Sequence, residues 1–331
     1  MKLHENRVKI LKVPVDLLTK KLVLDMLGQL GDSVRGYTVF TPNPEIVVDA
    51  QSDPLFCEAL NQADLSLVDG KGLELALIYL SKISSCKVEL LKPILGLFEA
   101  LNVVCHSFHS EVSLLSLEGR NYEFERYQGS NLVKDLISSY PDKTFYFIGT
   151  RYQSGIESAN EAFKALQKEF PNAKLVGSVS CRQEVGLDSF QASSGSKDTA
   201  VSENFGRMKD VDFELVKSKI LSDLAKYQLN TVDFVFVGTG HKRQEFWIQK
   251  HKNDLPFKVI AGVGGTFDFI RGSKKRAPVF VQKLGLEWIF RLLQEPSMAR
   301  FKRILKAFPY FPILVYFDSI KNKNSFQLRS N

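Results

Sequence analysis

The sequence lacks the features of a membrane-spanning or secreted protein. It contains no run of about 18 apolar residues, so a transmembrane helix is not expected. Its first residues, MKLHENRVKILKV, include no long apolar segment, so a signal peptide is not predicted. The four cysteines form no CxxC pair and show no cysteine–histidine spacing of a zinc site. Reduced thiols in a cytoplasmic protein fit these absences.

Two signatures of nucleotide and nucleic-acid binding are also missing. The sequence has no GxGxxG, so a dinucleotide site has little support. It has no aromatic and basic sheet motif of an RNA-binding domain, so nucleic acid is not an expected partner. The formal net charge of +7 nevertheless fits an anionic partner, such as a phosphate group or an acidic membrane surface. For the charge alone, a basic surface without a partner is the alternative interpretation.

The most informative stretch of the chain covers residues 233–278. Two short apolar runs within it, at residues 234–237 and 259–263, are rich in β-branched or aromatic side chains. Such runs are typical of buried strands in a parallel sheet, although a buried helix segment is the alternative. Each run leads into a glycine turn, at residues 238–240 and 262–265, where backbone N–H groups can approach a ligand closely. Ligands of open α/β sheets bind at the carboxyl ends of strands, so these turns predict a site.

A carboxylate follows a strand in the first half of the chain as well. The apolar run at residues 65–68 ends at Asp69-Gly70, which places Asp69 where an acid or base of an α/β enzyme would lie. The alternative is a turn or N-cap aspartate, because Asp-Gly is a common turn pair. Gly149, after the predicted strand 144–148, likewise suits either a backbone contact to a nucleotide or only a tight turn.

The chain of 331 residues is long enough for one large or two ordinary domains. Its alternating short strands and helices predict an α/β fold with a mostly parallel sheet. Further strands are expected at residues 8–11, 37–41 and 174–179, and helices at residues 17–30, 46–60, 73–80, 155–170, 210–226, 284–293 and 300–308.

Several motifs occur in a fixed order along the second half of the chain. They are Gln244-Glu245, GVGG-x-FD at residues 262–268, G-x-x-KRAP at residues 272–278, and LEW-x-x-R-x-x-x-EP at residues 286–296. This order and spacing resemble the WecG/TagA/CpsF glycosyltransferases, glycosyltransferase family 26. The chain departs from the family pattern at Lys242, where the family usually has proline.

The resemblance extends to the first half of the chain and implies roles for its polar residues. Thr41, Asn43 and Glu45 match the family's T-x-N-x-E segment, and Asp69-Gly70 match its aspartate–glycine pair. In the family this aspartate is the proposed catalytic base, with the Thr and Asn lining the same pocket. A carboxylate suits that task, because it raises the electron density of an attacking sugar hydroxyl.

A second family segment, ER-x-x-GSDL, matches residues 125–132. Arg126 would hold an anionic group such as a phosphate by bidentate hydrogen bonds. Asn131 replaces the family aspartate, which removes a charge from that position. The substrate-binding residues expected from the motifs and the resemblance are Thr41, Asn43, Arg126, Gln244, Gly149, Gly240, Gly264, Arg300 and Arg303.

Two segments interrupt the family pattern. Residues 81–122 are interpreted as an insertion that forms a small subdomain or dimer element, with a membrane-facing hairpin as the alternative. Residues 186–206 are serine-rich and weakly apolar, which is typical of a loop.

The C-terminal segment is basic and aromatic. Residues 296–331 contain seven Lys or Arg and one acid, a local net charge of 7 − 1 = +6. Residues 300–308 predict a basic amphipathic helix, and the aromatic run at residues 309–317 is too short to span a bilayer but suits its interface. A helix that packs on the core is the alternative. The family has an appendage of this kind, linked to membrane association and to closure of the active site by arginines, to which Arg300 and Arg303 are the nearest matches.

The expected fold is therefore a Rossmann-like α/β core at residues 1–295 with a C-terminal appendage at residues 296–331. The resemblance implies an inverting glycosyltransferase of cell-surface polysaccharide synthesis. It would move an N-acetylmannosamine-type or related sugar from a UDP-sugar to a polyprenyl-pyrophosphate-linked acceptor, at the inner face of the cell membrane. No cofactor and no metal are expected, and a homo-oligomer is left open. The alternative is a non-catalytic module that binds a nucleotide sugar or nucleic acid.

Overall fold

The computed structural model describes residues 4–31, 36–84, 95–97, 99, 113–117, 119–152, 154–182, 210–275, 277–278, 281, 287–294 and 296–321. The serine-rich loop expected at residues 186–206 lies outside these residues, as does most of the expected insertion before residue 113. The elements are, in chain order, β1 (Arg7–Ile10), β2 (Val13–Asp16), α1 (Lys20–Leu30), β3 (Tyr37–Phe40), α2 (Pro44–Ser52), α3 (Pro54–Asn61), β4 (Leu65–Ser66), α4 (Lys71–Ser84), β5 (Ser113–Leu117), β6 (Arg120–Phe124), α6 (Gly129–Ser139), β7 (Thr144–Arg151), α7 (Ser158–Glu169), β8 (Lys174–Arg182), α9 (Asp210–Lys226), β9 (Val232–Gly238), α10 (Arg243–His251), β10 (Phe257–Gly262), α11 (Thr266–Ile270), α13 (Glu287–Gln294), α14 (Met298–Leu305), a wide helical turn (Lys306–Tyr310) and α15 (Phe311–Lys321).

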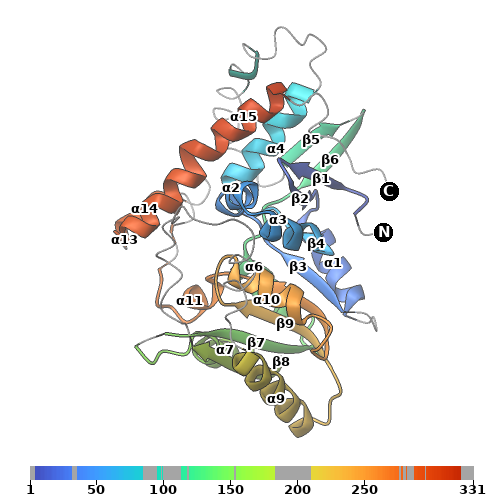
Figure 1. The fold of residues 1–331 in the computed structure, drawn as a ribbon. Helices are drawn as coiled ribbons and strands as arrows, with labels where there is room; N and C mark the ends of the chain where they lie inside the picture. The colour runs from blue at the N-terminus through green and yellow to red at the C-terminus, as the bar shows by residue number, and fades with distance from the viewer. Residues whose placement is uncertain are drawn as a thin grey trace. The chain divides into compact units, whose positions relative to one another are not determined.

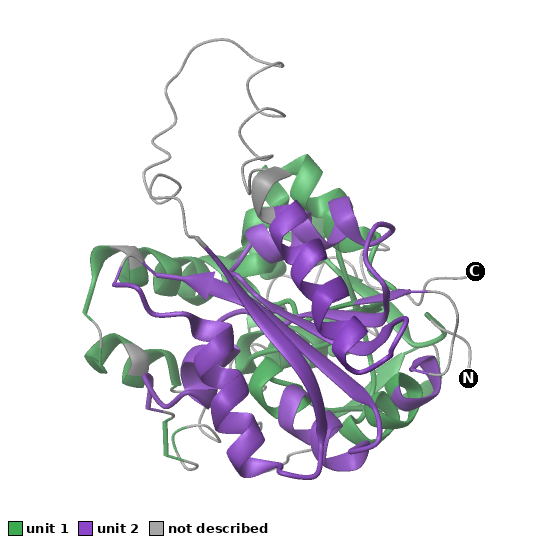
Figure 2. Cartoon of the chain, turned by 90° about the horizontal axis from the view of Figure 1, so that it is seen from below, with its two compact units in different colours: residues 1–27, 39–132, 276–331 green, residues 28–38, 133–275 purple. Residues whose placement is uncertain are grey.

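A six-stranded sheet in the order β4-β3-β10-β9-β7-β8 confirms the predicted Rossmann-like α/β fold (Figure 1). Strand β3 pairs with β4, β7 with β8 and β9, and β9 with β10, all in parallel. The chain divides into two compact units, coloured separately in Figure 2. Unit 1 comprises residues 1–27, 39–132 and 276–331, and unit 2 comprises residues 28–38 and 133–275. The expected boundary at residue 296 stays a prediction.

The contacts of successive side chains on β7 show that helices of unit 2 lie on both faces of the sheet. Successive side chains of a strand point to opposite faces of the sheet. Tyr146 donates its hydroxyl to Asp223 of α9 at 3.0 Å. The next residue, Phe147, contacts Phe163 of α7 and Phe267 of α11, with ring centroids 6.0 Å apart in both pairs. Helices α7 and α11 therefore cover one face of β7, and α9 covers the other.

Helix α10 shares a layer with α9 through an aromatic contact. Phe213 of α9 stacks on His251 of α10 with centroids 3.9 Å apart, and meets Trp247 edge-on at 6.4 Å. The two helices follow β8 and β9 in the chain, so both crossovers return over the same face of the sheet, as right-handed connections require.

An unpredicted antiparallel hairpin, β1–β2, begins unit 1. Arg7 on this hairpin is fully buried at 1% exposure and forms a bidentate pair with Asp16, Nε to Oδ1 and Nη2 to Oδ2, both at 2.7 Å. Its guanidinium also donates to the carbonyls of Ala63 and Asp64 at 2.9 Å. Asp16 in turn accepts the backbone N–H of Ser66 at 2.7 Å. This ion pair joins the hairpin to the segment that leads into β4.

The single helix expected at residues 46–60 is wrong, because the structure contains two helices there. Helix α2 ends at Ser52 and α3 begins at Pro54. Pro54 has no backbone N–H, which suits the first position of a helix and not its interior. Asp53 caps the new helix, since its Oδ1 accepts the N–H of Phe56 at 3.0 Å.

The expected basic helix at residues 300–308 is correct only in its first part. Helix α14 ends at Leu305, and Phe308 in the following turn has an extended backbone. The aromatic run then continues as α15, which lies along α4 (Figure 1). Its buried face includes Phe311 and Val315, and Ser319 lies 3.1 Å from the hydroxyl of Tyr79 on α4. One face of α15 therefore packs on the core, as the alternative interpretation of the C-terminal segment expected.

The described end of the expected insertion forms an antiparallel hairpin, β5–β6. Its burial alternates along β5, with Leu115 and Leu117 buried and Leu114 exposed. This is the pattern of a two-stranded sheet with one covered face, and α4 lies on that face. The expected small subdomain or dimer element stays a prediction.

Candidate active site

Two backbone hydrogen bonds gather three chain segments around Asp69 in unit 1. Asp69 donates its N–H to the carbonyl of Pro42 at 3.0 Å, which holds it beside the turn that follows β3. Tyr127 donates its N–H to the carbonyl of Val68 at 2.8 Å, which brings the segment containing Arg126 to the same place. The structure therefore brings together the strand ends that the sequence singled out in unit 1.

The T-x-N-x-E segment has one structural task in addition to its expected role. Asn43 is the N-cap of α2, and its Oδ1 accepts the N–H of Ile46 at 3.0 Å. Because Oδ1 is used in this cap, the Nδ2 group of Asn43 is the part of the side chain that suits hydrogen bonding to a ligand. Thr41 is buried at the end of β3, 7% exposed.

The side chains of the ER-x-x-GS segment contact three other parts of unit 1. Glu125 accepts the N–H of Lys20 at 2.8 Å and so satisfies the start of helix α1. Arg126 pairs through Nε with Glu74 of α4 at 2.7 Å. Gln128 donates to Glu287 of the LEW motif at 3.0 Å, which links two of the family segments directly. Asn131 lies in the first turn of α6.

The basic residues of the C-terminal helices meet α2. Arg303 Nε lies 3.4 Å from Glu45, and Lys306 donates to Asp49 at 2.7 Å. Glu45 stands two residues after Asn43, so Arg303 is close to the predicted pocket. Arg300 lies in the first turn of α14, where its N–H donates to the capping Ser297 at 3.2 Å.

Gln244 connects the two glycine turns of unit 2. Its Oε1 accepts the N–H of Gly264 at 2.8 Å, and its Nε2 donates to Glu245 at 2.8 Å. Its side chain is buried, and both ends of its amide are occupied within unit 2. Gly240 and Gly264 have φ angles of 99° and 57°, which favour glycine. Gln244 therefore fixes the shape of the second turn, and direct contact with a substrate stays a prediction.

Glu245 is a buried carboxyl that the sequence analysis marked only as part of a motif. It is 1% exposed, and its Oε2 lacks a hydrogen-bond partner among the described residues. Burial raises the pKa of Glu245 above the ordinary value of a glutamate.

Lys242 has φ of 65° at the start of α10. A proline ring holds φ near −65°, so the usual family residue is incompatible with this backbone. The departure at Lys242 therefore coincides with a backbone conformation that proline cannot adopt.

Gly149 permits close packing of a helix on its strand. A Cβ atom at this position would lie 2.6 Å from the backbone nitrogen of Ala159 and from Oγ of Ser158. Ser158 Oγ also accepts the N–H of Thr150 at 2.8 Å. The start of α7 therefore explains why glycine is required here, and a nucleotide contact by Gly149 stays a prediction.

Asp268, the buried carboxylate of the FD motif, contacts the G-x-x-KRAP segment through Lys274. It accepts from Lys274 at 2.8 Å, from Arg271 at 3.1 Å and from the hydroxyl of Tyr152 at 3.0 Å. Burial acts to raise the pKa of Asp268, but Lys274 and the other two donors outweigh it and hold that pKa below its usual value. Burial and then the nearby carboxylate raise the pKa of Tyr152 to about 12. The sequence analysis missed Tyr152, because no motif marks it.

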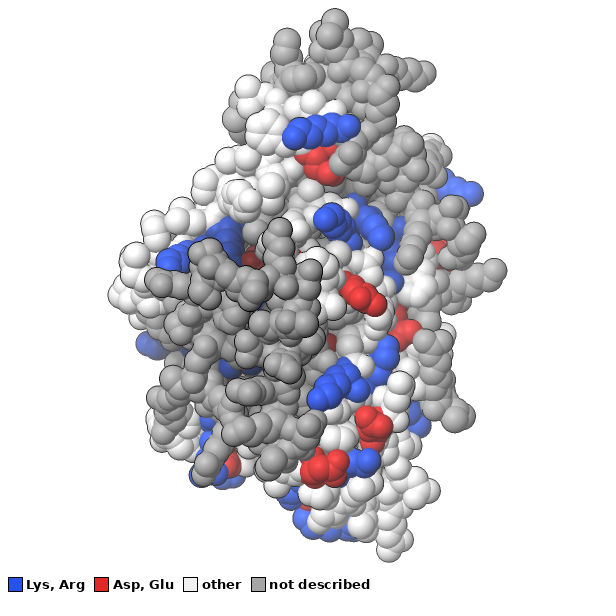
Figure 3. Space-filling model, viewed as in Figure 1, with Lys and Arg blue, Asp and Glu red and all other residues white. Residues whose placement is uncertain are grey.

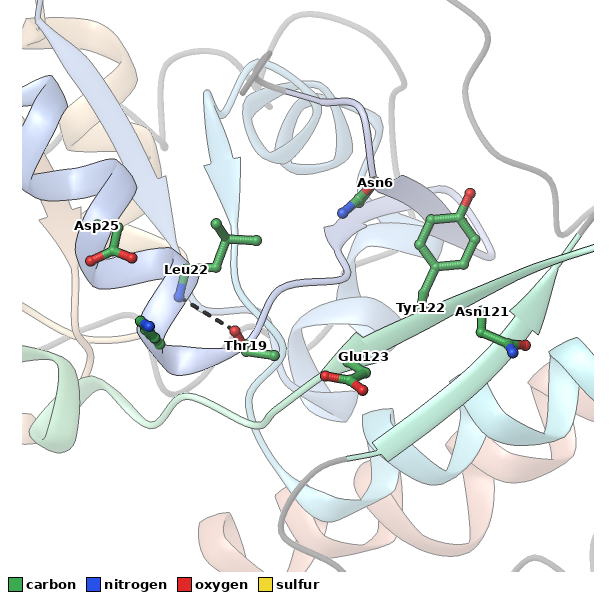
Figure 4. A pocket seen from close by; sticks show the side chains of 8 residues that line it. Asn6, Thr19, Leu22, Asp25, Asn121, Tyr122 and Glu123 are labelled. Atoms are coloured by element: carbon green, nitrogen blue, oxygen red, sulfur yellow. Dashed lines mark hydrogen bonds between the residues drawn. The ribbon is translucent and has the colours of Figure 1, made fainter.

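A separate open hollow in unit 1 has a volume of about 510 Å³ (Figure 4). Figure 4 shows the turn before α1, where Thr19 accepts the N–H of Leu22 at 3.3 Å, facing side chains of β6. Its lining residues are Asn6, Thr19, Lys21, Leu22, Asp25, Asn121, Tyr122 and Glu123. It shares no residue with the predicted site.

The predicted residues thus form two groups. Unit 1 holds Thr41, Asn43, Asp69, Arg126, Arg300 and Arg303, and unit 2 holds Gly149, Gly240, Gln244 and Gly264. Within each unit, hydrogen bonds and ion pairs connect most of these residues or their immediate neighbours.

The chain is similar to known proteins over nearly its whole length. The profile of the "Glycosyl transferase WecG/TagA/CpsF family" matches residues 8–107 and 111–325. Proteins from Staphylococcus aureus strains MRSA252, MW2 and NCTC 8325 are 26% identical over 309 residues, which cover 92% of this chain and 90% of theirs. Each is named N-acetylglucosaminyldiphosphoundecaprenol N-acetyl-beta-D-mannosaminyltransferase.

A Rossmann-like sheet with polar residues gathered at its strand ends, together with these matches, defines an enzyme of the glycosyltransferase class. Within that class, the chain belongs to the WecG/TagA/CpsF family, whose profile covers nearly its whole length. The predicted family is confirmed, and the alternative of a non-catalytic module is wrong.

Proposed function

We propose that the protein transfers an N-acetylmannosamine-type sugar from a UDP-sugar to a polyprenyl-pyrophosphate-linked acceptor, with inversion and without a catalytic metal. The names of the relatives support the sugar and the lipid-linked acceptor. The observation that carries the proposal is the position of Asp69, hydrogen-bonded to the Asn43 turn on one side and next to the Arg126 segment on the other. A base and a phosphate-binding cation are the two groups that this reaction needs.

In the proposed reaction, the Asp69 carboxylate accepts the proton of the acceptor hydroxyl. The hydroxyl oxygen bonds to the anomeric carbon of the donor from the face opposite the leaving group. The bond between that carbon and the phosphate oxygen breaks, and its electron pair leaves with UDP. A single displacement of this kind inverts the anomeric centre. Arg126 and backbone N–H groups would stabilise the charge on the departing diphosphate.

The glycine turns of unit 2 are proposed to hold the donor. Gln244 orients the Gly264 turn, and Gly240 begins the turn before α10. Both turns follow β-strands at their carboxyl ends, where α/β folds bind nucleotides. Thr41 and Asn43 would act on the same substrate as Asp69, within unit 1. Gln244 would act on the donor through the Gly264 turn. A structure with UDP bound away from Gln244 would contradict this part of the proposal.

We propose a peripheral location on the inner face of the cell membrane. None of the helices in the described part of the chain is both long and apolar enough to cross a bilayer. On the face shown in Figure 3, charge alone does not mark a docking surface, because acidic and basic side chains are interspersed among its described residues. The C-terminal helices do expose apolar side chains beside their basic residues, namely Leu293, Met298, Phe301, Leu305, Phe308, Tyr310, Ile313 and Phe317. Such a surface suits the interface of an anionic bilayer.

Release of UDP from a panel of UDP-sugars tests the proposal, with a short-chain lipid-pyrophosphoryl-GlcNAc as acceptor. UDP-N-acetylmannosamine is expected to give acceptor-dependent release and a product heavier by one sugar, with and without EDTA. Loss of activity in EDTA, restored by Mg²⁺, would contradict the metal-independent part. Release of UDP without a glycosylated lipid product would contradict the proposed acceptor.

A further inference from the structure

Glu74 lies at the centre of a cluster of charged residues in unit 1. It is buried, 2% exposed, in the first turn of α4. Its Oε1 accepts from Lys71 at 2.9 Å and from the hydroxyl of Ser113 at 2.7 Å. Its Oε2 pairs with Arg126 Nε at 2.7 Å. One buried carboxylate therefore holds two cations and one hydroxyl.

The cluster lies next to the predicted base. Lys71 stands two residues after Asp69 in the chain, at the first position of α4. The hydrogen bond from Tyr127 N–H to the Val68 carbonyl, 2.8 Å long, holds Arg126 beside the same strand end. The Lys71 side chain is 9% exposed and that of Arg126 is 23% exposed, so both reach the surface in part.

We propose that Glu74 is a positioning residue that holds Lys71 and Arg126 as one paired cation site for the phosphates of the substrate. The inference rests on the proposed function, and it adds Lys71 as a phosphate ligand and Glu74 as the group that fixes the spacing between the two cations.

The charge balance of the cluster supports this role. Two cations and one carboxylate leave a net charge of +1, which an approaching phosphate would offset. Arg126 uses Nε for Glu74, so its terminal amino groups remain the donors that suit a bidentate phosphate contact. A cation that is already fixed loses less conformational freedom on binding than a mobile one. The buried Glu74 carboxylate holds both cations in place. If either cation moved away, the negative charge of Glu74 would be left buried and poorly compensated.

Ser113 links the hairpin β5–β6 to this site. It is the first residue of β5, at the described end of the expected insertion, and it is 3% exposed. Its hydroxyl donates to the same oxygen of Glu74 that binds Lys71. The hairpin β5–β6 therefore holds the Oε1 atom of Glu74 by a hydrogen bond, whereas Arg126 forms an ion pair with Oε2.

Calorimetric binding of inorganic pyrophosphate to the full chain tests the inference without reference to turnover. Wild type is expected to bind pyrophosphate, and Glu74→Gln is expected to bind it about 10-fold more weakly, which is the size of one charge-assisted interaction. Lys71→Met should weaken binding to a similar degree, and Ser113→Ala about 3-fold, since a neutral hydrogen bond contributes less. Glu58→Gln, an exposed glutamate on α3, is the matched control and should bind as wild type does.

A double-mutant cycle separates positioning from general destabilisation. In an Arg126→Ala background, Glu74→Gln should weaken pyrophosphate binding less than it does in wild type, because one of its two targets is gone. In the transfer assay, Glu74→Gln should raise KM more than it lowers kcat. Equal pyrophosphate affinity of wild type and Glu74→Gln would overturn the inference, as would no binding by wild type. If Glu74→Gln does not fold, Lys71→Met and Ser113→Ala decide alone. Absence of sugar transfer by a wild type that binds pyrophosphate would instead overturn the proposed function.

Discussion

Asp69 and Pro42 are joined by a backbone hydrogen bond of 3.0 Å, in which the N–H of Asp69 donates. Leu67 donates in the same way to Phe40 at 2.8 Å, so the pairing of β3 and β4 continues past the end of both strands. The carboxylate proposed as the base is therefore fixed by main-chain geometry, and a change of its side chain should leave the local fold in place.

Replacement of Asp69 by Asn should abolish most of the activity. Turnover is expected to fall by about 10²–10⁴-fold, the usual size of general-base assistance, with an unchanged melting temperature. Asp142→Asn, at an exposed turn, provides the matched control. Turnover of Asp69→Asn within a few-fold of wild type would show that another group accepts the proton.

Removal of exposed apolar side chains from the C-terminal helices should weaken membrane binding. The combined variant Phe301→Ser, Ile313→Ser and Phe317→Ser is expected to bind phosphatidylglycerol liposomes at least about 10-fold more weakly, because less apolar surface enters the interface. These residues lie on the open side of α14 and α15. Sedimentation with liposomes measures the bound fraction.

The control for that experiment is Leu55→Ser, an equally exposed apolar residue on α3, which should bind as wild type does. These variants test docking more sharply than deletion of residues 296–331, because deletion would also expose the side of α4 that α15 covers. Unchanged binding by the combined variant would mean that the C-terminal helices do not dock on the bilayer.

Arg303 should contribute to catalysis independently of the membrane. Its Nε lies 3.4 Å from Glu45, close to the predicted pocket. Arg303→Ala is expected to lower kcat/KM about 10-fold on a short water-soluble acceptor, since one phosphate contact of a cation is lost. Lys302→Ala, on an exposed position of the same helix, should change this value little. Equal values for both variants would leave α14 with a docking role only.

The buried pair of Arg7 and Asp16 should be important for stability. Arg7→Met is expected to lower the free energy of unfolding by about 3–5 kcal/mol, because it leaves the Asp16 carboxylate buried without its cation. Urea denaturation measures the loss. The double variant Arg7→Met with Asp16→Leu should recover part of it, although the N–H of Ser66 then lacks its acceptor. A loss below about 1 kcal/mol would contradict the prediction.

Asp268 should make the stability of unit 2 depend on pH. Its pKa in the folded protein lies below the unfolded value of about 3.9. A depressed carboxyl pKa contributes stability above the unfolded value, and this contribution is lost as the pH falls through the folded value. Asp268→Asn is therefore expected to destabilise the protein by about 1–3 kcal/mol at pH 7, and by less at pH 3. Denaturant titrations at both pH values measure the difference. An equal loss at pH 7 and pH 3 would assign the effect to packing.

The sequence predicted the sheet well because its strands are short apolar runs that end at glycine or a polar turn. It also located the Asp69 end of β4, since a carboxylate after such a run is visible without a structure. The break between α2 and α3 was visible too, at Asp53-Pro54, but the apolar spacing on both sides favoured one helix.

Buried charges explain what the sequence could not predict. Arg7 and Glu74 belong to residue types that are usually exposed, so the sequence alone predicts that both lie on the surface. Their partners lie far away in sequence, with Arg7 bonded to Ala63 and Glu74 to Arg126. Periodicity describes one element at a time, and it contains no information about which distant element supplies a counter-charge.

The division of unit 1 into three chain segments has a consequence for its synthesis. Helix α4 is complete at Ser84, whereas α15, which covers part of it, begins only at Phe311. At about 5–20 residues per second, the intervening chain takes roughly 10–50 s to emerge from the ribosome. During that interval the apolar side of α4 has no α15 against it, while residues 133–275 of unit 2 are being made. Demand for chaperones should therefore be greatest late in translation, and a stop codon before Phe311 should yield a product that aggregates even though its sheet is complete.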